Sequence, residues 1–102
     1  MSKVIVSYKV KPGQADDNQQ YVKKVFEELE RDKPAGVRYA TFLESDGATF
    51  VHIASIETAN GDNPLSHLQA FQAFQAGLKE RCEVQPVVIE MEEVGSYQVF
   101  GR

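Results

Sequence analysis

The sequence predicts an α+β domain of the ferredoxin-like type, with the element order βαββαβ: one four-stranded antiparallel sheet with two helices on one face. The first observation is a period-two alternation of apolar residues, which is typical of strands and recurs in residues 3–11, 37–45, 49–58 and 84–94. The second is helical spacing of apolar residues in segments 14–32 and 64–82. At 102 residues the chain is interpreted as a single domain, residues 1–102.

The first strand and the first helix are separated by a clear break. Residues 3–11 are rich in β-branched side chains, which favours a strand, and Pro12 and Gly13 end it. In residues 14–32, acidic residues come early and basic residues late, which suits the helix dipole. The apolar face of this helix is expected to consist of Tyr21, Val22, Val25, Phe26 and Leu29.

The next two strands form a predicted hairpin. Lys33 to Gly36 break the first helix, and the Asp46-Gly47 pair between segments 37–45 and 49–58 is a strong turn signal. Segment 49–58 places four residues on one face, namely Phe50, His52, Ala54 and Ile56. Its other face is also apolar, so both faces of this strand are expected to be covered.

The second helix is predicted to begin at about Pro64, because Asn63 is a good N-cap and proline suits the first helical position. Its apolar stripe would contain His67, Leu68, Phe71, Phe74, Leu78 and Cys82. A histidine in the first turn, close to the positive end of the helix dipole and partly buried, is favoured as the neutral ring. Two interpretations of His67 stay open: it packs at the edge of the core, or it lines a ligand pocket.

Segment 84–94 is the predicted fourth strand, and Pro86 near its start fits an edge or a strand opening. The tail after residue 94 still alternates Tyr97 and Val99 with Gln98 and Phe100, which is not the pattern of a polar, disordered tail. Because the two middle strands offer apolar side chains on both faces, the face without helices needs a cover. We expect a second copy of the chain to supply it, as a homodimer with the tail reaching across.

The composition of the chain limits the kinds of partner that are expected. The 15 acidic and 11 basic residues give a net charge of −4 without a basic cluster, so nucleic acid is not an expected partner. The chain has one cysteine, and the residues after Met1 lead directly into a strand pattern rather than a signal peptide. It also lacks an apolar run long enough to span a membrane. These features predict a cytoplasmic protein that has no membrane partner.

Several stretches resemble a known family. They are Lys11-Pro12-Gly13-Gln14 after the opening strand, residues 34–42 (PAGVRYATF), the 45–47 hairpin, residues 50–53 (FVHI) and residues 67–71 (HLQAF). Together they are similar to the antibiotic biosynthesis monooxygenase (ABM) domain of the dimeric α/β barrel superfamily. The resemblance covers nearly the whole chain and implies a dimeric barrel with a small cavity between sheet and helices in each subunit.

For function, the resemblance implies a cofactor-free monooxygenase acting on a small phenolic or quinol-type aromatic substrate, which would itself reduce oxygen. No cofactor or metal is expected, because two histidines fall short of a usual ligand set. Two alternatives stay open: a non-catalytic dimeric module that binds a small ligand, and a haem-binding or haem-degrading protein. Haem-degrading members of the superfamily use an asparagine, a tryptophan and a helix histidine, and this chain has no tryptophan.

The candidate site residues follow from the resemblance and from the polar groups that could face such a cavity. His67 is the predicted proton acceptor, because a neutral imidazole can act as a general base near neutral pH. Tyr97 or Tyr39 would orient the substrate. Substrate-binding positions are predicted at His52, Tyr39, Phe71 and Phe74.

Overall fold

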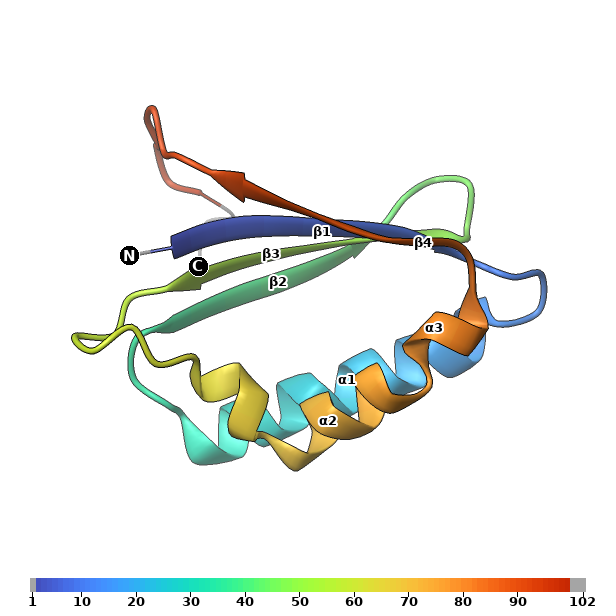
Figure 1. Cartoon of the computed structure of the whole chain (residues 1–102), viewed down its shortest axis with the longest axis horizontal. Helices are drawn as coiled ribbons and strands as arrows, with labels where there is room; N and C mark the ends of the chain where they lie inside the picture. The colour runs from blue at the N-terminus through green and yellow to red at the C-terminus, as the bar shows by residue number, and fades with distance from the viewer. Residues whose placement is uncertain (1, 100–102) are drawn as a thin grey trace.

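The computed structural model describes residues 2–99, and it has the predicted ferredoxin-like α+β fold (Figure 1). Within these residues, an antiparallel four-stranded sheet has the strand order β2-β3-β1-β4. The strands are β1 (Ser2–Val10), β2 (Val37–Leu43), β3 (Thr49–Ile56) and β4 (Cys82–Met91). The helices are α1 (Ala15–Asp32), the short 3-10 helix η1 (Pro64–His67), α2 (Gln69–Ala76) and α3 (Leu78–Arg81).

Both long helices lie on the same face of the sheet, as predicted (Figure 1). The helix α1 buries Val22 and Val25 against the sheet, consistent with its apolar stripe. The core between the layers is formed by Tyr8, Val10, Val22, Val25, Phe50, Ala54, Leu65, Leu68, Phe74, Leu78 and Cys82. None of the described helices is both long and apolar enough to cross a membrane.

Strand register brings polar and aromatic side chains together on the face of the sheet that the helices cover. Tyr8 of β1 pairs with Phe50 of β3, while His52 lies between Val6 on one side and Thr41 on the other. Because side chains alternate along a strand, the neighbours two residues away share this face. The face predicted to be shared by Phe50, His52 and Ala54 is therefore the one that the helices cover, and all three residues are buried.

The prediction of one continuous helix from Pro64 to Cys82 is wrong. Asn63 does cap the first turn, since its side chain accepts a hydrogen bond from the Leu65 amide, but that turn is the 3-10 helix η1. Leu68 is extended, with φ −75° and ψ 131°, and a second break follows at Gly77. A hypothetical Cβ on Gly77 would lie 2.8 Å from Nη1 of Arg81, so the close approach of that guanidinium favours glycine there.

The break at Leu68 is compensated from another helix. The Glu28 carboxylate on α1 accepts hydrogen bonds from the backbone amides of Gln69 (3.2 Å) and Ala70 (2.8 Å). These amides belong to the first turn of α2, where no side chain of α2's own N-cap serves them. A carboxylate at this position also complements the positive end of the helix dipole.

The alternation predicted for the fourth strand holds only in part. The register shifts between Ser7, which pairs with Val87, and Lys9, which pairs with Val84, so Gln85 and Pro86 form a bulge. The strand β4 lies at the edge of the sheet, which agrees with the prediction for a proline strand. The bulge brings Gln85 to the helix side, whereas strict alternation from Val87 and Ile89 would place it with them on the other face.

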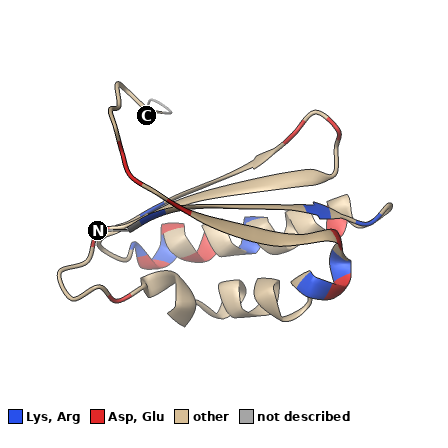
Figure 2. Cartoon of the chain, turned by 45° about the horizontal axis from the view of Figure 1, so that its top comes forward, with Lys and Arg blue, Asp and Glu red and all other residues tan. Residues whose placement is uncertain are grey.

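The face of the sheet without helices is apolar and open. Its exposed members include Phe42, Val87, Ile89 and Met91, and Figure 2 shows charges along α1, at α3 and near strand ends rather than across the sheet. Residues 92–99 form no strand and are exposed, so the alternation of Tyr97, Gln98 and Val99 does not extend the sheet. Phe100, the last residue of that predicted pattern, lies outside the described residues.

Candidate functional site

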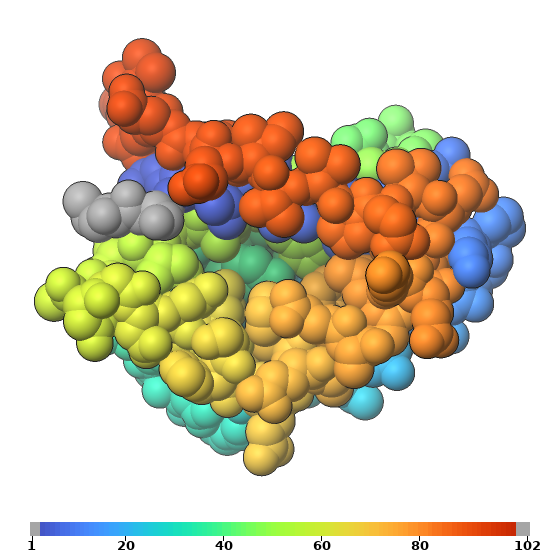
Figure 3. All heavy atoms as spheres, viewed as in Figure 1, coloured from blue at the N-terminus to red at the C-terminus, as the bar shows by residue number. Residues whose placement is uncertain are grey.

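A cavity of about 590 Å³ lies between the sheet and the helix α2, and it opens between α2 and β4, where the space-filling view is hollowed (Figure 3). Its apolar and aromatic lining comprises Val4, Val6, Tyr8, Tyr39, Ala54, Leu65, Phe71, Phe74, Leu78, Pro86 and Val88. Its polar lining comprises His52, Asn63, Ser66, Gln75, Lys79 and Gln85. This volume and this largely apolar lining are typical of a small-molecule site.

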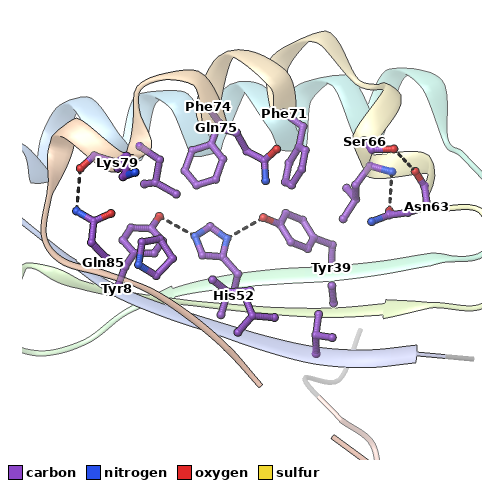
Figure 4. Close-up of a pocket in the computed structure, with 17 residues that line it drawn as sticks. Tyr8, Tyr39, His52, Asn63, Ser66, Phe71, Phe74, Gln75, Lys79 and Gln85 are labelled. Atoms are coloured by element: carbon purple, nitrogen blue, oxygen red, sulfur yellow. Dashed lines mark hydrogen bonds between the residues drawn. The ribbon is translucent and has the colours of Figure 1, made fainter. Parts of the chain in front are cut away.

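Two phenylalanines of α2 face the sheet across the cavity (Figure 4). Phe71 and Phe74 are 6.0 Å apart between ring centroids, and Phe71 meets Tyr39 edge-on at 6.4 Å. They lie on the same side of α2 because residues three apart on a helix are neighbours on its surface. The roof of the cavity is therefore aromatic, and so are parts of its floor.

His52 is the polar centre of the floor (Figure 4). Its side chain is nearly buried, at 4% exposure, and it lies between two tyrosines. Nε2 is 2.7 Å from the Tyr8 hydroxyl, while Nδ1 is 2.7 Å from the Tyr39 hydroxyl and 2.9 Å from Oγ1 of Thr41. Both ring nitrogens thus have hydrogen-bond partners, and the strand register described above places all of them.

The hydrogen bonds continue behind Tyr8, away from the cavity. Nδ2 of Asn18 donates to the Tyr8 hydroxyl at 2.8 Å, and Nε of Arg81 donates to Oδ1 of Asn18 at 3.1 Å. Arg81 also donates to the Phe74 carbonyl at 2.9 Å, and its guanidinium lies 4.3 Å from the centroid of the Tyr21 ring. Within residues 2–99, no carboxylate forms an ion pair with this buried cation.

Burial sets the protonation states of the central groups. It lowers the pKa of His52 to about 4, so the imidazole is neutral near pH 7. Burial raises the pKa of Tyr39 to about 12, although a hydrogen bond with Thr41 opposes this shift. Burial also raises the pKa of Tyr8. At neutral pH the row therefore consists of two phenols and a neutral imidazole.

Four of the predicted site residues meet in this one place. His52, Tyr39, Phe71 and Phe74 come from β3, β2 and α2, and all four line the cavity. The four side chains thus line one common pocket, and their role in binding a substrate stays a prediction.

The other two predicted residues lie elsewhere. The prediction that His67 lies in the apolar stripe is wrong: its side chain is 68% exposed, and Nε2 lies 3.4 Å from a carboxylate oxygen of Asp62. The physical reason is the break at Leu68, which rotates η1 out of phase with α2. Tyr97 is 85% exposed in the segment after β4, and its role as an orienting residue stays a prediction.

Sequence reasoning missed Asn18, Thr41 and Arg81 as members of the network. One signal was present for Asn18, which lies four residues before Val22 and seven before Val25, on the apolar stripe of α1. A buried polar residue on such a stripe requires a partner. Within residues 2–99, no three His, Cys, Asp or Glu side chains come together as ligands for a metal ion.

Comparison with known proteins identifies the fold. No protein-family profile and no curated protein sequence matches the chain. A crystal structure described as an antibiotic biosynthesis monooxygenase superposes with a TM-score of 0.75 at 20% identity, covering 93% of this chain and 100% of its own. The proposed antibiotic biosynthesis monooxygenase of Nitrosomonas europaea gives 0.74 at 13% identity, covering 91% and 89%. A protein of Mycobacterium tuberculosis gives 0.75 at 12% identity, covering 93% and 96%.

These similarities define the class of fold to which the chain conforms. The chain has the ferredoxin-like α+β fold of solved structures that carry the name antibiotic biosynthesis monooxygenase, over more than nine-tenths of its length. The predicted ferredoxin-like α+β fold of the chain is confirmed, and its pairing as a dimer stays a prediction.

Proposed function

We propose that the protein is a cofactor-free monooxygenase that acts on a small phenolic or quinol-type aromatic substrate in the cavity under α2. The observation that carries the proposal is the row of Tyr8, His52 and Tyr39, which places buried, neutral hydrogen-bonding groups in an aromatic pocket. The fold shared with structures named antibiotic biosynthesis monooxygenases supports it.

The cavity suits a flat aromatic molecule. Phe71 and Phe74 offer their rings from above and Tyr39 offers a third ring, and stacked or edge-on contacts with a substrate ring are favourable. The polar groups at the opening, among them Lys79 and Gln85, would face the polar end of the substrate or the solvent. A substrate could thus bury its ring while keeping a route for its proton to water.

The proposed reaction uses the substrate as its own reductant. An electron-rich phenol loses a proton, and the resulting anion transfers one electron to O₂, giving a substrate radical and superoxide. These two combine at a ring carbon that carries hydrogen, and the resulting peroxide anion takes up a proton from water to give a hydroperoxide. Loss of water from the hydroperoxide leaves a carbonyl at that carbon, so one oxygen atom enters the product and the other leaves as water. The substrate as a whole supplies all four electrons that O₂ accepts.

The protein would contribute by favouring the anion. The phenol of Tyr39 is protonated at neutral pH and can donate a hydrogen bond to a phenolate oxygen. The buried Arg81 adds positive charge behind the network without a carboxylate to cancel it. Both effects would lower the pKa of a bound phenol, and neither requires the exposed His67.

The test is oxygen uptake by the purified protein with a panel of reduced quinols and polyphenols, after subtraction of autoxidation. We expect saturable uptake and, with ¹⁸O₂, one labelled oxygen atom in the product. The Tyr39→Phe variant should lower the rate by about tenfold, because it removes one hydrogen bond to a charged oxygen. The His67→Ala variant is the matched control, and its turnover should stay near that of the wild type. Loss of activity in His67→Ala alone would return the role of proton acceptor to His67.

A second candidate function is a binding module without catalysis. It is favoured by the finding that, among the described residues, every buried side-chain nitrogen or oxygen already has a hydrogen-bond partner, both ring nitrogens of His52 included. A protein that binds aromatic ligands but never raises oxygen uptake above background would support this candidate over the monooxygenase.

We also propose that two copies pair through the open face of the sheet. Phe42, Val87 and Ile89 are each at least 40% exposed on this face, which leaves a contiguous apolar surface of the kind that marks an interface. Cross-strand pairs place Ile5 beside both Ile53 and Ile89, so the surface spans three strands. A second copy would cover it through a two-fold axis, because the same patch then serves both partners.

A further inference from the structure

The orientation of the Asn18 side chain is fixed by Arg81. A guanidinium carries only hydrogen-bond donors, so the atom of Asn18 that faces Nε of Arg81 at 3.1 Å must be the carbonyl oxygen. Arg81 is itself held by the Phe74 carbonyl and by the ring of Tyr21. An amide flip of Asn18 would place two donors against each other and is therefore excluded.

The fixed amide determines what the Tyr8 hydroxyl does. The NH₂ group of Asn18 donates to the Tyr8 oxygen at 2.8 Å, so that oxygen acts as an acceptor on this side. The hydroxyl of Tyr8 is buried, at 1% exposure of the residue, and its hydrogen needs an acceptor. The remaining partner is Nε2 of His52, at 2.7 Å. Tyr8 therefore donates, and Nε2 carries the lone pair.

The tautomer of His52 follows. A neutral imidazole has one protonated nitrogen, and with Nε2 as the acceptor the proton is on Nδ1. Nδ1–H faces the oxygens of Tyr39 (2.7 Å) and Thr41 (2.9 Å). Since the Tyr39 oxygen accepts from Nδ1–H, its own hydrogen is directed elsewhere, to Thr41 or to a ligand in the cavity.

We infer that Arg81 and Asn18 are positioning residues that lie outside the cavity, fix His52 as the Nδ1–H tautomer and so make the Tyr39 hydroxyl a hydrogen-bond donor to the bound substrate. The matching ligand is an aromatic molecule that presents an acceptor oxygen, either a carbonyl or a phenolate, to Tyr39. This choice of ligand rests on the proposed function, whereas the tautomer does not. Each group in this series donates its hydrogen bond to the next one, from the buried Arg81 guanidinium to the cavity.

The tautomer is measured by long-range ¹H–¹⁵N NMR on labelled protein near neutral pH, in which coupling to the two ring protons distinguishes Nε2 from Nδ1. The His67→Asn variant assigns the signals, because only His52 then remains. We expect Nδ1 to be protonated and Nε2 to be unprotonated. A wild-type spectrum with Nε2 protonated overturns the inference, and this readout is independent of any activity.

The variant Asn18→Asp tests whether the Asn18 amide determines the tautomer of His52. A carboxylate can only accept, so it would accept from Arg81 and from the Tyr8 hydroxyl, and Tyr8 would then accept from Nε2–H of His52. We expect Nε2 to become protonated in this variant. Gln20→Glu is the matched control, because it makes the same change of charge at an exposed position two residues away on α1. Nε2 should stay unprotonated in the control; an unprotonated Nε2 in a folded Asn18→Asp protein contradicts the role of Asn18.

The donor role of Tyr39 is tested with two probes of matched shape, 2-acetylnaphthalene and 2-ethylnaphthalene, which differ in one carbonyl. Titrations are followed by amide chemical shifts in the wild type and in Tyr39→Phe. We expect the variant to bind the ketone about 3- to 10-fold more weakly, as for one lost hydrogen bond, and the hydrocarbon unchanged. Equal effects on the two probes, or no preference of the wild type for the ketone, refute the donor role.

The failure of this inference and the failure of the proposed function are distinguishable. A protein with the Nδ1–H tautomer and with carbonyl selectivity, but without oxygen uptake, refutes the monooxygenase and leaves the inference standing. A protein that consumes oxygen but holds His52 as the Nε2–H tautomer refutes the inference and leaves the proposed monooxygenase standing.

Discussion

Arg81 donates a hydrogen bond to Asn18 across 63 positions of the chain, and neither residue reaches the cavity. A buried guanidinium is costly unless it is paired and hydrogen-bonded. Here the neutral oxygens of Asn18 and Phe74 and the ring of Tyr21 surround it. These contacts fix the position of the guanidinium, and the network in front of it is directed toward the cavity.

The buried imidazole of His52 should make stability depend on pH. The pKa of His52 is about 4 in the folded protein and near its ordinary value of 6.5 in the unfolded chain. Between these values the unfolded chain binds more protons, so the free energy of unfolding should fall as pH decreases from about 6.5 to about 4. The total loss is on the order of 3 kcal/mol, at 1.36 kcal/mol per unit of pKa. Urea unfolding measured across this range of pH gives the slope.

Two variants separate this effect from other titrations. His52→Gln removes the titrating group and should flatten the slope, whereas His67→Asn should leave it as in the wild type. A slope that persists unchanged in His52→Gln would assign the pH dependence to other groups.

Gly77 should resist substitution for a steric reason. Its φ of −108° suits any residue, but a Cβ there would lie 2.8 Å from Nη1 of Arg81, which is held by two hydrogen bonds. We expect Gly77→Ala to lower the free energy of unfolding by about 1–3 kcal/mol, as in overpacking. Gly95→Ala is the control, because no atom lies within 4 Å of its added Cβ. Equal urea midpoints for the two variants would contradict the predicted clash.

Glu28 should stabilise α2 from outside that helix. Its carboxylate accepts from the amides of Gln69 and Ala70, so Glu28→Ala should cost about 1–2 kcal/mol, the range for loss of a helix cap. Glu27→Ala, at the exposed neighbouring position, removes the same charge without touching α2. Chemical denaturation of both variants measures the difference, and a Glu28→Ala protein as stable as Glu27→Ala would exclude the cap.

Pairing through the open face of the sheet should be sensitive to charge at its centre. Ile89→Glu places a carboxylate on that face opposite Ile5, and we expect it to convert the dimer to a monomer. Val94→Glu is the control at a position that is 99% exposed and lies after β4. Light scattering coupled to gel filtration gives the masses. A monomeric wild-type protein would refute the proposed pairing.

The fold could be predicted because the signals that define it are local. Alternation in segments 3–11 and 49–58 identifies β1 and β3 and the side chains that share a face, and Asp46-Gly47 marks the turn before β3. The same alternation put His52 on one face with Phe50 and Ala54, and the structure shows that this face meets the helices, where His52 lines the cavity. The order of the elements follows from these strand patterns together with the helical spacing in segments 14–32 and 64–82.

The parts that could not be predicted depend on distant contacts. The single helical period predicted from Pro64 breaks at Leu68, where Glu28 on α1 supplies the amide partners that let α2 begin anew at Gln69. Strict periodicity therefore put His67 on the wrong side. Likewise, the link between Arg81 and Asn18 leaves no pattern in either segment, since each residue finds its partner only after the chain has folded.

The helix α2 is tied down at both ends. Glu28 holds its first turn to α1, and Arg81 holds the Phe74 carbonyl near its last turn. The roof of the cavity thus cannot swing away as a unit without breaking charged hydrogen bonds. A molecule must therefore enter or leave through the opening between α2 and β4, past long side chains such as Gln75 and Lys79. The rate of its passage would be set by rotamer changes of these side chains rather than by a hinge motion of the helix.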